Sequence, residues 1–579
     1  MKINRRHLIG ASFIICHLSF SAALLSCSSM LETDSEIVEY EKDNTLNHLT
    51  DSVYSSLGII NKMQIIADRT VLLGEVRGDL VETTDMASAD LKRLSAFNLK
   101  EKNKYNAVSD YYAVINNCNY FLAHADTAMK RRGVQVLLPE YAAAKAFRAW
   151  TYLQLALNYE KVPLVLTPLM TEQEARNAMN QTPVDIAGIC DYFINDLTPY
   201  AHIEKPDFGR IYSEDSKDFF IPMRALLGDL CLWAGRYTEA AKWYHDFLND
   251  SKNPVQLISS RSVWDPTNLT YTSPTLSYYV SSSDFLCFIP MESRSFDGVV
   301  SDLRNVFGST EDNKYYFQLT PSEGMRQISA AQEYCTEYKK STQTDTLYAP
   351  RTGLNSNLWI GDLRLASNNY ISSLGGKSAY SEYNSIYQTC GKVFRLYVPL
   401  YRGTMVYLRF AEALNRAGLP QSAMLILKHG MCNDNVKLYV DATEQAKAGT
   451  LIDFDPSIFK RLDDAGNRAI YGIHSFGSGD SHVNQKYVLP QPPTALATYQ
   501  DTVDWQIPEV ENMIITEMAL EGAFEGNRFY DLMRVALRRN DPAYLAKPLS
   551  VRNSTTPDAA LYTLLMDKSN WYLPLQPQQ

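Results

Sequence analysis

The segment from about residue 139 to residue 159 has the clearest periodic pattern of apolar positions in the chain. Ala142, Ala146, Ala149, Leu153 and Ala156 recur at spacings of three and four residues, which places them on one face of a helix. A proline begins this segment and another follows its end, as is typical of helix boundaries. The small side chains predict close packing against a neighbouring helix. Less regular patterns predict two earlier helices, over about residues 46–66 and 105–129.

Two later segments share a pattern that joins one helix to the next. In residues 232–240 and in residues 415–423, an Ala-Gly pair is followed by an alanine five positions after the glycine. We expect Gly235 and Gly418 to end helices in the left-handed conformation, and the alanines to let the following helices pack closely. The pattern is similar to that of tetratricopeptide repeats, but about 180 residues separate the two copies, so a regular repeat array is not supported.

Loop-rich regions separate these helical segments. The chain is rich in Ser, Tyr, Asn, Thr and Gly over about residues 254–399, with short β-like runs such as Phe285–Ile289, and it is irregular again over about residues 439–506. The sequence therefore predicts a mainly α fold, in which large loop-rich insertions and a few short strands decorate a tetratricopeptide-like scaffold of helical hairpins. Long insertions of this kind commonly carry binding function. We expect a single domain over residues 45–579, with its scaffold over about 45–250, 400–433 and 508–540.

The amino-terminal residues predict export and a lipid anchor. Three cations, at Lys2, Arg5 and Arg6, precede an apolar stretch over residues 8–25, which is the layout of a signal peptide over residues 1–26. Polar breaks within the stretch argue against a membrane-spanning helix. Leu24-Leu25-Ser26-Cys27 resembles a bacterial lipobox, in which Cys27 becomes the acylated first residue; an ordinary signal peptide is the alternative. Residues 27–44 would then form an acidic, solvated tether.

Charge and cysteine usage narrow the classes of partner. The formal net charge is −10, so an acidic chain gains nothing from counterion release and nucleic acid is an unfavourable partner. Beyond Cys27 the cysteines are odd in number, far apart and without a CxxC pair, so neither a zinc site nor a disulfide framework is supported. We expect Cys118 and Cys231 to be small core residues. No pattern indicates a cofactor, and calcium binding by loop carboxylates has no specific support.

No catalytic motif survives inspection. The chain lacks GxSxG, HExxH and Walker-type sequences. The run of residues 477–480 is interpreted as a turn, and His474 and His482 lack the spacing of metal ligands on a helix. Glu517, Glu521 and Glu525 fall on one helical face, where they could suggest glycoside hydrolysis. With Arg528, Asp531 and Arg534 following, we interpret them instead as a structural ion-pair network.

Several segments together resemble a known family. Residues 524–534, Phe-Glu-Gly-Asn-Arg-Phe-Tyr-Asp-Leu-Met-Arg, are similar to the late "EG-x-R-x-x-DL-x-R" helix of the SusD/RagB outer-membrane lipoproteins. The resemblance extends over essentially the whole mature chain. Its other segments, in the order of the family, are residues 73–79, 111–119, 144–152, 162–164, 361–364, 408–413 and the C-terminal strand at 571–574.

The resemblance implies a nutrient-binding protein without enzymatic activity. Such a protein would sit in the outer membrane facing the exterior and dock on a SusC/RagA-like TonB-dependent transporter, trapping an oligosaccharide or a peptide. The alternatives are a structural helical-repeat adaptor and a surface glycoside hydrolase or peptidase. Aromatic rings suit sugar binding, although burial in the scaffold is the competing explanation for each of them. The candidate ligand-binding residues are the aromatic residues Trp264, Tyr271, Tyr315, Tyr316 and Trp359, with Asp85 and Asp90 from the loop after the early segment.

Overall fold

The protein is described by a computed structural model, in which residues His48–Gln579 group into one compact unit. The residues that the structure describes are 49–257, 261–265, 270–272, 284–293, 296–308, 318–335, 361–365, 370–371, 388–389, 391–393, 397–459 and 471–575. The predicted signal peptide, Cys27 and the predicted tether lie outside these ranges.

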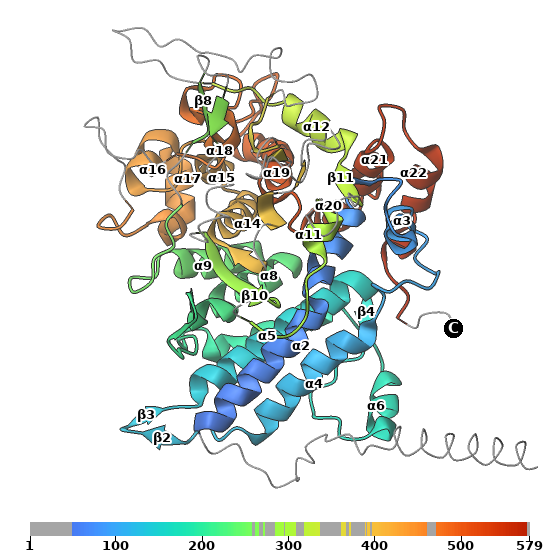
Figure 1. Ribbon diagram of the computed structural model, residues 1–579. Coiled ribbons are helices and arrows are strands. Elements are labelled where there is room, and N and C mark those ends of the chain that lie inside the picture. Colours follow the sequence, from blue (N-terminus) through green and yellow to red (C-terminus); the bar gives the residue numbers. More distant parts are fainter. Residues whose placement is uncertain are drawn as a thin grey trace, which may run out of the picture. The chain divides into compact units, whose positions relative to one another are not determined.

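Three helices near the start of the described chain lie side by side (Figure 1). They are α2 (Leu49–Val76), α4 (Val108–His124) and α5 (Leu138–Tyr159). Helix α5 lies in the middle of the scaffold, since it contacts α2 and α4 as well as α7 (Ile186–Leu197). Nearly every residue of α5 from Ala142 onward is buried, so the predicted alanine face is confirmed as a packing face.

Helical hairpins continue the scaffold, as the glycine pattern predicts. Helices α8 (Met223–Trp233) and α9 (Tyr237–Leu248) form one hairpin. Helices α14 (Gly403–Arg416) and α15 (Pro420–Lys428) form the other, and α14 packs against α9. Gly235 and Gly418 have φ angles of 73° and 85°, which a side chain disfavours. Two hairpins far apart in sequence are therefore neighbours in space.

Two C-terminal helices join the halves of the scaffold. Helix α19 (Tyr499–Gly522) packs against α14 and α15, whereas α20 (Arg528–Arg539) packs against α2. Helix α19 begins nine residues before residue 508, where this part of the scaffold is predicted to start. A capping box at Thr498 starts α19 earlier, and the helix continues through Pro508.

The described strands form two-stranded pairs only. The longest pair is β10 (Phe285–Pro290) with β14 (Tyr397–Arg402), which brings residues inside the predicted insertion against its carboxyl-terminal end and confirms the β-like run at 285–289. The other pairs join β1 (Val81–Thr83) to β11 (Leu319–Pro321), β2 (Lys130–Arg131) to β3 (Val134–Gln135), β4 (Lys161–Val162) to β5 (Val184–Asp185), β6 (Arg210–Ile211) to β7 (Glu214–Asp215), β8 (Val263–Asp265) to β9 (Thr270–Thr272) and β12 (Tyr370–Ile371) to β13 (Gln388–Thr389).

Short helices complete the described chain. Two α-helices and two 3₁₀ helices among them fall in the region predicted to be irregular from residue 439 to residue 506, where α19 also begins, so that prediction is wrong in part. The shorter helices are α3 (Ala89–Ser95), α6 (Glu172–Met179), α11 (Leu303–Val306), α12 (Glu323–Ala330), α16 (Asn433–Tyr439), α17 (Ala442–Ala448), α18 (Ser475–Ser478), α21 (Ala543–Ser550) and α22 (Ala559–Leu565), with a 3₁₀ helix at Gly449–Ile452.

Several predicted boundaries differ from the structure. Helix α2 continues ten residues beyond the predicted end at residue 66, and α4 ends at His124, before the β2–β3 hairpin. The expected C-terminal strand at 571–574 is absent from the described residues. A 3₁₀ turn at Lys568–Trp571 buries Trp571, whose indole N–H donates to the carbonyl of Leu565 at 2.8 Å.

The mainly α fold class is confirmed. Cys118 and Cys231 are buried free cysteines, as expected for core residues. None of the described helices is both long enough and apolar enough to cross a membrane. The exact limits of the predicted domain, scaffold and insertions stay predictions.

Candidate functional site

The segments that carry the family resemblance meet at a buried junction between the first and the last parts of the chain. Arg528 donates through Nε and Nη2 to the carboxylate of Asp79, at 2.5 and 2.9 Å. Arg77, fully buried, donates to the carbonyl oxygen of Trp571 at 3.0 Å and lies over the ring of Phe529. These charged side chains face one another in the interior, so they hold the fold together and are not available to a ligand.

Glu75 lies in the same junction. Its Oε1 accepts a hydrogen bond from the backbone N–H of Gly526 at 2.9 Å. Burial raises the pKa of Glu75 to about 7, although backbone N–H groups at Gly526 and Phe524 and the charge of Lys392 act in the opposite direction. A carboxyl group with such a pKa could serve acid–base chemistry, but Glu75 is 0% exposed and has no access to a substrate.

The three predicted glutamates form a buried ion ladder along and just after α19. Arg364 contacts Glu517 at 2.5 Å and Glu521 at 3.2 Å, and Arg402 contacts Glu521 at 3.0 Å and Glu525 at 2.9 Å. All five side chains are 6% exposed or less. The interpretation of the glutamates as a structural ion-pair network is therefore confirmed.

The expected partners within that network are wrong, because long-range contacts decide them. Arg528 pairs with Asp79 rather than with the glutamates of α19. Arg534 pairs with Glu412 and Asp531, at 2.5 and 2.9 Å. Two cations of the ladder, Arg364 and Lys392, come from the insertion instead, and the third, Arg402, ends strand β14 just after it.

The ladder keeps its outer carboxylates ionised. Burial alone would raise the pKa of Glu517, but the charges of Arg364 and His474 lower it to about 2. Arg402 and Lys392 likewise lower the pKa of Glu525 to about 2 against the effect of burial. A glycosidase needs a general acid that still holds its proton near neutral pH. Glu517 and Glu525 do not meet that requirement, which disfavours hydrolysis at this place.

The α18 region anchors the stems of three loops. The backbone N–H groups of Ser262, Cys335 and Leu363 donate to the carbonyls of Ser475, Ser478 and Gly477, at 3.0, 3.0 and 2.9 Å. We call these six residues the loop-stem cluster. They connect the β8–β9 hairpin, the end of the segment after α12 and the segment at 361–365 to one buried core. The predicted ligand residues Trp264, Tyr271 and Trp359 belong to segments that begin or end at these stems in the sequence.

The run at 477–480 was predicted to be a turn, and this is wrong in part. Gly477 and Ser478 end the short helix α18, and Gly479 follows with a φ angle of 77°. A Cβ atom on Gly477 would lie 1.8 Å from Oδ1 of Asp362, so only glycine permits this contact. The small residues of this run were the sequence signal that other segments pack closely here. The prediction of a simple turn did not use that signal.

Two of the predicted aromatic residues are opposite one another in the backbone. The register of β8 with β9 pairs Trp264 with Tyr271. Tyr315, Tyr316 and Trp359 lie outside the described residues.

The predicted aspartates take different positions. Asp90, in the first turn of α3, forms an ion pair with Arg93 at 3.3 Å, which is a local helix contact. Asp85 is exposed in the loop after β1. Gln318 fixes this loop, because its carbonyl and its side chain accept from the backbone N–H groups of Thr84 and Ser88 at 3.0 Å each. The stretch that contains Tyr315 and Tyr316 re-enters the described chain at Gln318, so Asp85 lies close to where that stretch ends.

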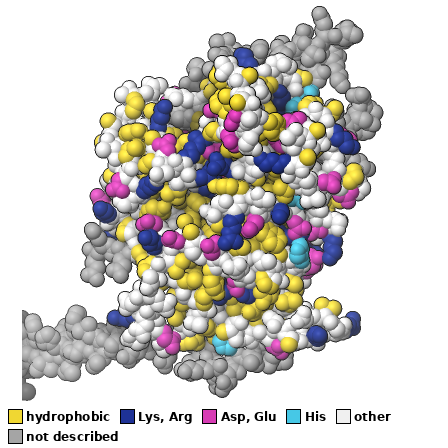
Figure 2. All heavy atoms as spheres, turned by 180° about the vertical axis from the view of Figure 1, so that it is seen from behind, with side chains coloured by type: hydrophobic (Ala, Val, Ile, Leu, Met, Phe, Trp, Pro, Cys, Tyr) yellow, Lys and Arg dark blue, Asp and Glu magenta, His cyan; other side chains and the backbone are white. Residues whose placement is uncertain are grey.

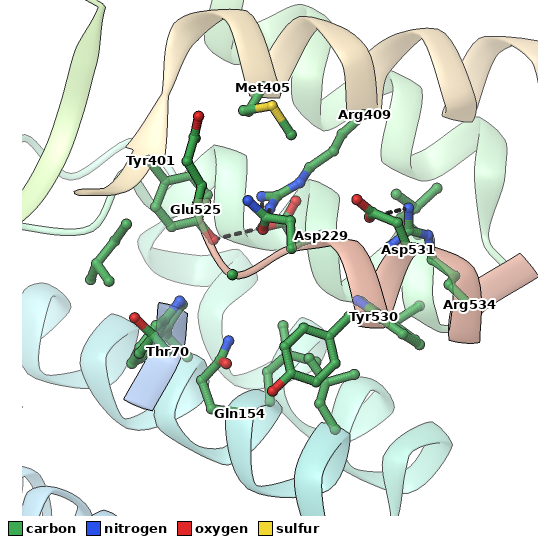
Figure 3. A pocket seen from close by; sticks show the side chains of 18 of the residues that line it. Thr70, Gln154, Asp229, Tyr401, Met405, Arg409, Glu525, Tyr530, Asp531 and Arg534 are labelled. Carbon is green, nitrogen blue, oxygen red and sulfur yellow. Dashed lines mark hydrogen bonds and ion pairs between the residues drawn. The ribbon is translucent and has the colours of Figure 1, made fainter. Parts of the chain in front are cut away.

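A polar cleft lies between α5, α8, α14 and the start of α20 (Figure 3). Asp229 is at its centre, where it accepts from the hydroxyls of Tyr244 and Tyr401 at 2.6 and 2.7 Å and from Arg409 at 2.8 Å. Arg409 also donates to Asn527 at 3.1 Å. No pattern in the sequence indicates this cleft, because its polar groups come from segments that are distant along the chain.

The cleft is small. Its volume is about 80 Å³, which holds only a handful of water-sized groups. An oligosaccharide does not fit this space. Oδ2 of Asp531, on its wall, has no hydrogen-bond partner among the described residues, and burial raises the pKa of this carboxyl despite Arg534 and Arg409. We therefore assign the cleft to the packing of the scaffold, which leaves the segments that extend from the loop-stem cluster as the candidate site for a larger ligand.

Metal ligands do not gather in the described part of the chain, where no group of three or more His, Cys, Asp and Glu side chains is arranged around a common point. Nδ1 of His474 donates to the ionised carboxylate of Glu517 at 2.9 Å, and the ring stacks on Tyr487. Its role is to pack and pair within the ion ladder.

Solved structures share this fold over most of their length. A SusD superfamily protein from Bacteroides vulgatus matches with a TM-score of 0.55 at 13% identity, covering 92% of this chain and 96% of the other. A SusD superfamily protein from Bacteroides thetaiotaomicron matches with a TM-score of 0.50 at 15% identity, covering 91% and 95%. A SusD-like carbohydrate binding protein from Bacteroides vulgatus also matches with a TM-score of 0.50 at 15% identity, covering 84% and 83%.

Sequence comparisons add nothing to these structural matches. No family model matches the chain, and no curated protein matches it significantly. At identities of 13–15% the structural likeness establishes the fold. The resemblance to the SusD/RagB proteins is thus confirmed as a SusD-like fold.

Proposed function

We propose that this chain, with its SusD-like fold, is a carbohydrate-binding lipoprotein of the outer membrane that passes its ligand to a TonB-dependent transporter. One observation carries the ligand class: a solved protein named as SusD-like and carbohydrate binding shares the fold over 84% of this chain. In this proposal acylated Cys27 anchors the protein, which faces the exterior. The described scaffold would hold the binding loops without taking part in any bond-breaking step.

The loops that extend in sequence from the loop-stem cluster are the proposed site. Their sequence is rich in Tyr, Ser and Asn, and it continues from the buried loop-stem cluster. Flat aromatic rings match the apolar faces of a sugar, and polar side chains match its hydroxyl groups. The β8–β9 hairpin brings Trp264 and Tyr271 into register at the edge of this base. The enclosed cleft is too small for the role, which supports the loops as the place where an oligosaccharide binds.

A binding screen tests the ligand class. The purified chain would be titrated with oligosaccharides from plant, host and microbial glycans, and with peptides, by calorimetry. We expect one glycan class to bind, and the Trp264→Ala and Tyr271→Ala double variant to bind it at least tenfold more weakly. Arg176→Ala, which alters an exposed helix far from these loops in sequence, is the matched control. Binding of peptides alone would overturn the glycan proposal, and release of shortened sugars would show an enzyme.

Two further measurements test the anchor and the partner. Mass spectrometry of the native protein should find an amino-terminal acylated Cys27, and Cys27→Ser should release the chain from membranes. Mild-detergent purification from outer membranes should recover a β-barrel transporter with it. Recovery of the chain alone, with no ligand that changes its melting temperature, would favour the structural adaptor.

A further inference from the structure

The β2–β3 hairpin carries three consecutive cations on a short, exposed tip. Lys130 pairs with Gln135 and Arg131 with Val134, and Arg132 and Gly133 make the turn with φ angles of 53° and 83°. Positive φ at both turn positions is the geometry of a tight two-residue hairpin loop. All of residues 130–135 are exposed, and no described carboxylate pairs with any of the three cations.

The tip also presents an apolar side chain to solvent. Val134 is 67% exposed and lies opposite Arg131. A Cβ atom on Gly133 would meet nothing within 4 Å, so the turn packs against no other part of the described fold. The hairpin protrudes at the lower right of Figure 2, where Lys and Arg side chains gather beside apolar atoms. The hairpin therefore contributes little to the core, although the chain as a whole is acidic, with a net charge of −10.

The hairpin lies at the end of the scaffold where α2 begins. Helices α2 and α5 run parallel, because Met63 contacts Thr151 and Arg77, just after α2, contacts Asn158. Both helices begin about 20 Å before the first of these contacts, at about 1.5 Å per residue. The hairpin directly precedes α5, so it lies beside the start of α2 at Leu49, as Figure 1 shows. About twenty residues separate Leu49 from Cys27.

We propose that the β2–β3 hairpin binds the phosphate-bearing headgroups of the membrane that holds the lipid anchor. This proposal rests on the proposed acylation of Cys27. Lys130, Arg131 and Arg132 would donate to headgroup phosphates, while Val134 enters the interface between headgroups and acyl chains. Cations near an anionic surface and an apolar side chain at the boundary are the two contributions that bind peripheral segments to membranes.

The contact would set the orientation of the whole scaffold. An anionic membrane surface repels an acidic protein. Charges interact over a Debye length of about 8 Å, and within that distance of the surface the cations of the hairpin would be attracted to it. With the hairpin and the start of α2 facing the lipid, α2 and α5 point away from it. Asp126, four residues before Lys130, is the acidic residue nearest in sequence to the tip.

Vesicle binding tests the proposal without the anchor. The chain from residue 27 onward, carrying Cys27→Ser, would be sedimented with vesicles of phosphatidylcholine alone or with added phosphatidylglycerol. We expect binding only to the anionic vesicles, and its loss at high salt. The triple variant Lys130→Gln, Arg131→Gln, Arg132→Gln should bind about 100-fold more weakly, from the usual contribution of each cation near such a surface. Val134→Ser should bind anionic vesicles more weakly than the parent chain at each salt concentration at which the parent binds.

A matched variant separates the hairpin from net charge. Lys100→Gln, Lys102→Gln and Lys104→Gln remove the same charge from exposed positions before α4, at its end opposite the hairpin. This variant should bind anionic vesicles as well as the parent chain. Equal loss in both triple variants, or equal binding by the hairpin variant and the parent, would overturn the proposal. So would a hairpin variant that binds vesicles normally but loses a protein partner.

Failure of this proposal is distinct from failure of the proposed function. Vesicle binding is measured on a chain that lacks the anchor, whereas acylation of Cys27 and glycan binding are measured separately on the native protein and on the loops. If the chain is acylated and binds its glycan, but its hairpin does not bind anionic vesicles, the proposed function stands. Only the proposed contact of the hairpin with headgroups is then refuted.

Discussion

A Cβ atom on Gly74 would lie 1.7 Å from the carbonyl oxygen of Gly526, so helix α2 and the turn before α20 touch backbone to backbone. Gly526 is held in the same way from the other side, with a φ angle of 86° and the carbonyl of Thr70 2.1 Å from where its Cβ would be. The obstacle in each case is backbone, which cannot rotate out of the way. These two glycines set the distance between the amino-terminal and carboxyl-terminal parts of the scaffold.

Gly74→Ala should therefore destabilise the protein by about 3 kcal/mol or more, at the upper end of the usual cost of overpacking. Gly58→Ala is the matched control, because Gly58 lies on the same helix and its Cβ would meet nothing within 4 Å. That change should stabilise the protein by about 0.5–1 kcal/mol through helix propensity. Urea unfolding measures both changes. Similar stabilities for the two variants would show that the crossing is looser than described.

The ion ladder should be sensitive to the loss of a single cation. Arg364→Met leaves Glu517 and Glu521 buried without one of their partners, and breaking a buried pair in this way typically costs about 3–5 kcal/mol. Arg176→Met removes a cation from a pair whose side chains are 70% and 79% exposed, and thermal unfolding should not detect it. An Arg364→Met variant with wild-type stability would contradict the structural role of the ladder.

Acid should unfold the protein through its ionised interior carboxylates. The guanidinium groups of Arg534 and Arg538 lower the pKa of Glu412 to about 2 against burial, as their counterparts do for Glu517 and Glu525. Because the folded pKa values lie below the unfolded value near 4.5, this stabilisation is complete above pH 5 and is lost as the pH falls toward 2. The three groups together contribute a slope of about 4 kcal/mol per pH unit in that window. Urea titrations from pH 6 to pH 3 measure it, and a flat profile would refute it.

Glu75 should act in the opposite direction. Its folded pKa, about 7, lies above the unfolded value, so its contribution to stability falls as the pH rises from about 4.5 through 7. Glu75→Gln keeps an acceptor for the N–H of Gly526 and cannot ionise. Between pH 5 and pH 8 the parent chain should lose up to about 3 kcal/mol relative to this variant. Glu160→Gln, at an exposed position, should follow the parent profile. Parallel profiles for Glu75→Gln and the parent would mean that Glu75 is ionised throughout.

Local patterns predicted the hairpins well because a single residue decides each of them. Gly235 and Gly418 adopt the left-handed conformation that the Ala-Gly pattern indicates, and the alanines that follow, Ala240 and Ala423, are fully buried. Where an element depends on partners from elsewhere, the same reasoning failed. Residues 571–574 form no strand, because the bonds of Trp571 go to Leu565 and Arg77 rather than to a neighbouring strand.

The ion ladder shows both outcomes within one feature. The i, i+4 spacing predicted correctly that Glu517 and Glu521 share a face of α19 and that the three acids serve the structure, but α19 ends at Gly522, so Glu525 follows the helix. It could not identify their partners, because Arg364 and Arg402 are 157 and 119 residues away from Glu521 and charge sign does not select among 55 cations. The prediction of the ligand residues was limited for a different reason. Loops carry no periodic pattern, so residue type alone suggested them, and Asp90 proved to be paired locally with Arg93.

The hydrogen bond from Arg77 to the carbonyl of Trp571 spans 494 positions along the chain. Contacts of such long sequence separation form late in folding, because a large loop must close before they stabilise anything. A chain that emerges from its amino terminus, from a ribosome or a secretion channel, would complete α2 long before Trp571 is available to contact Arg77. Folding of this junction can be completed only after Trp571 has emerged. A deletion that removes Trp571 would take away this contact and destabilise the packing of α2.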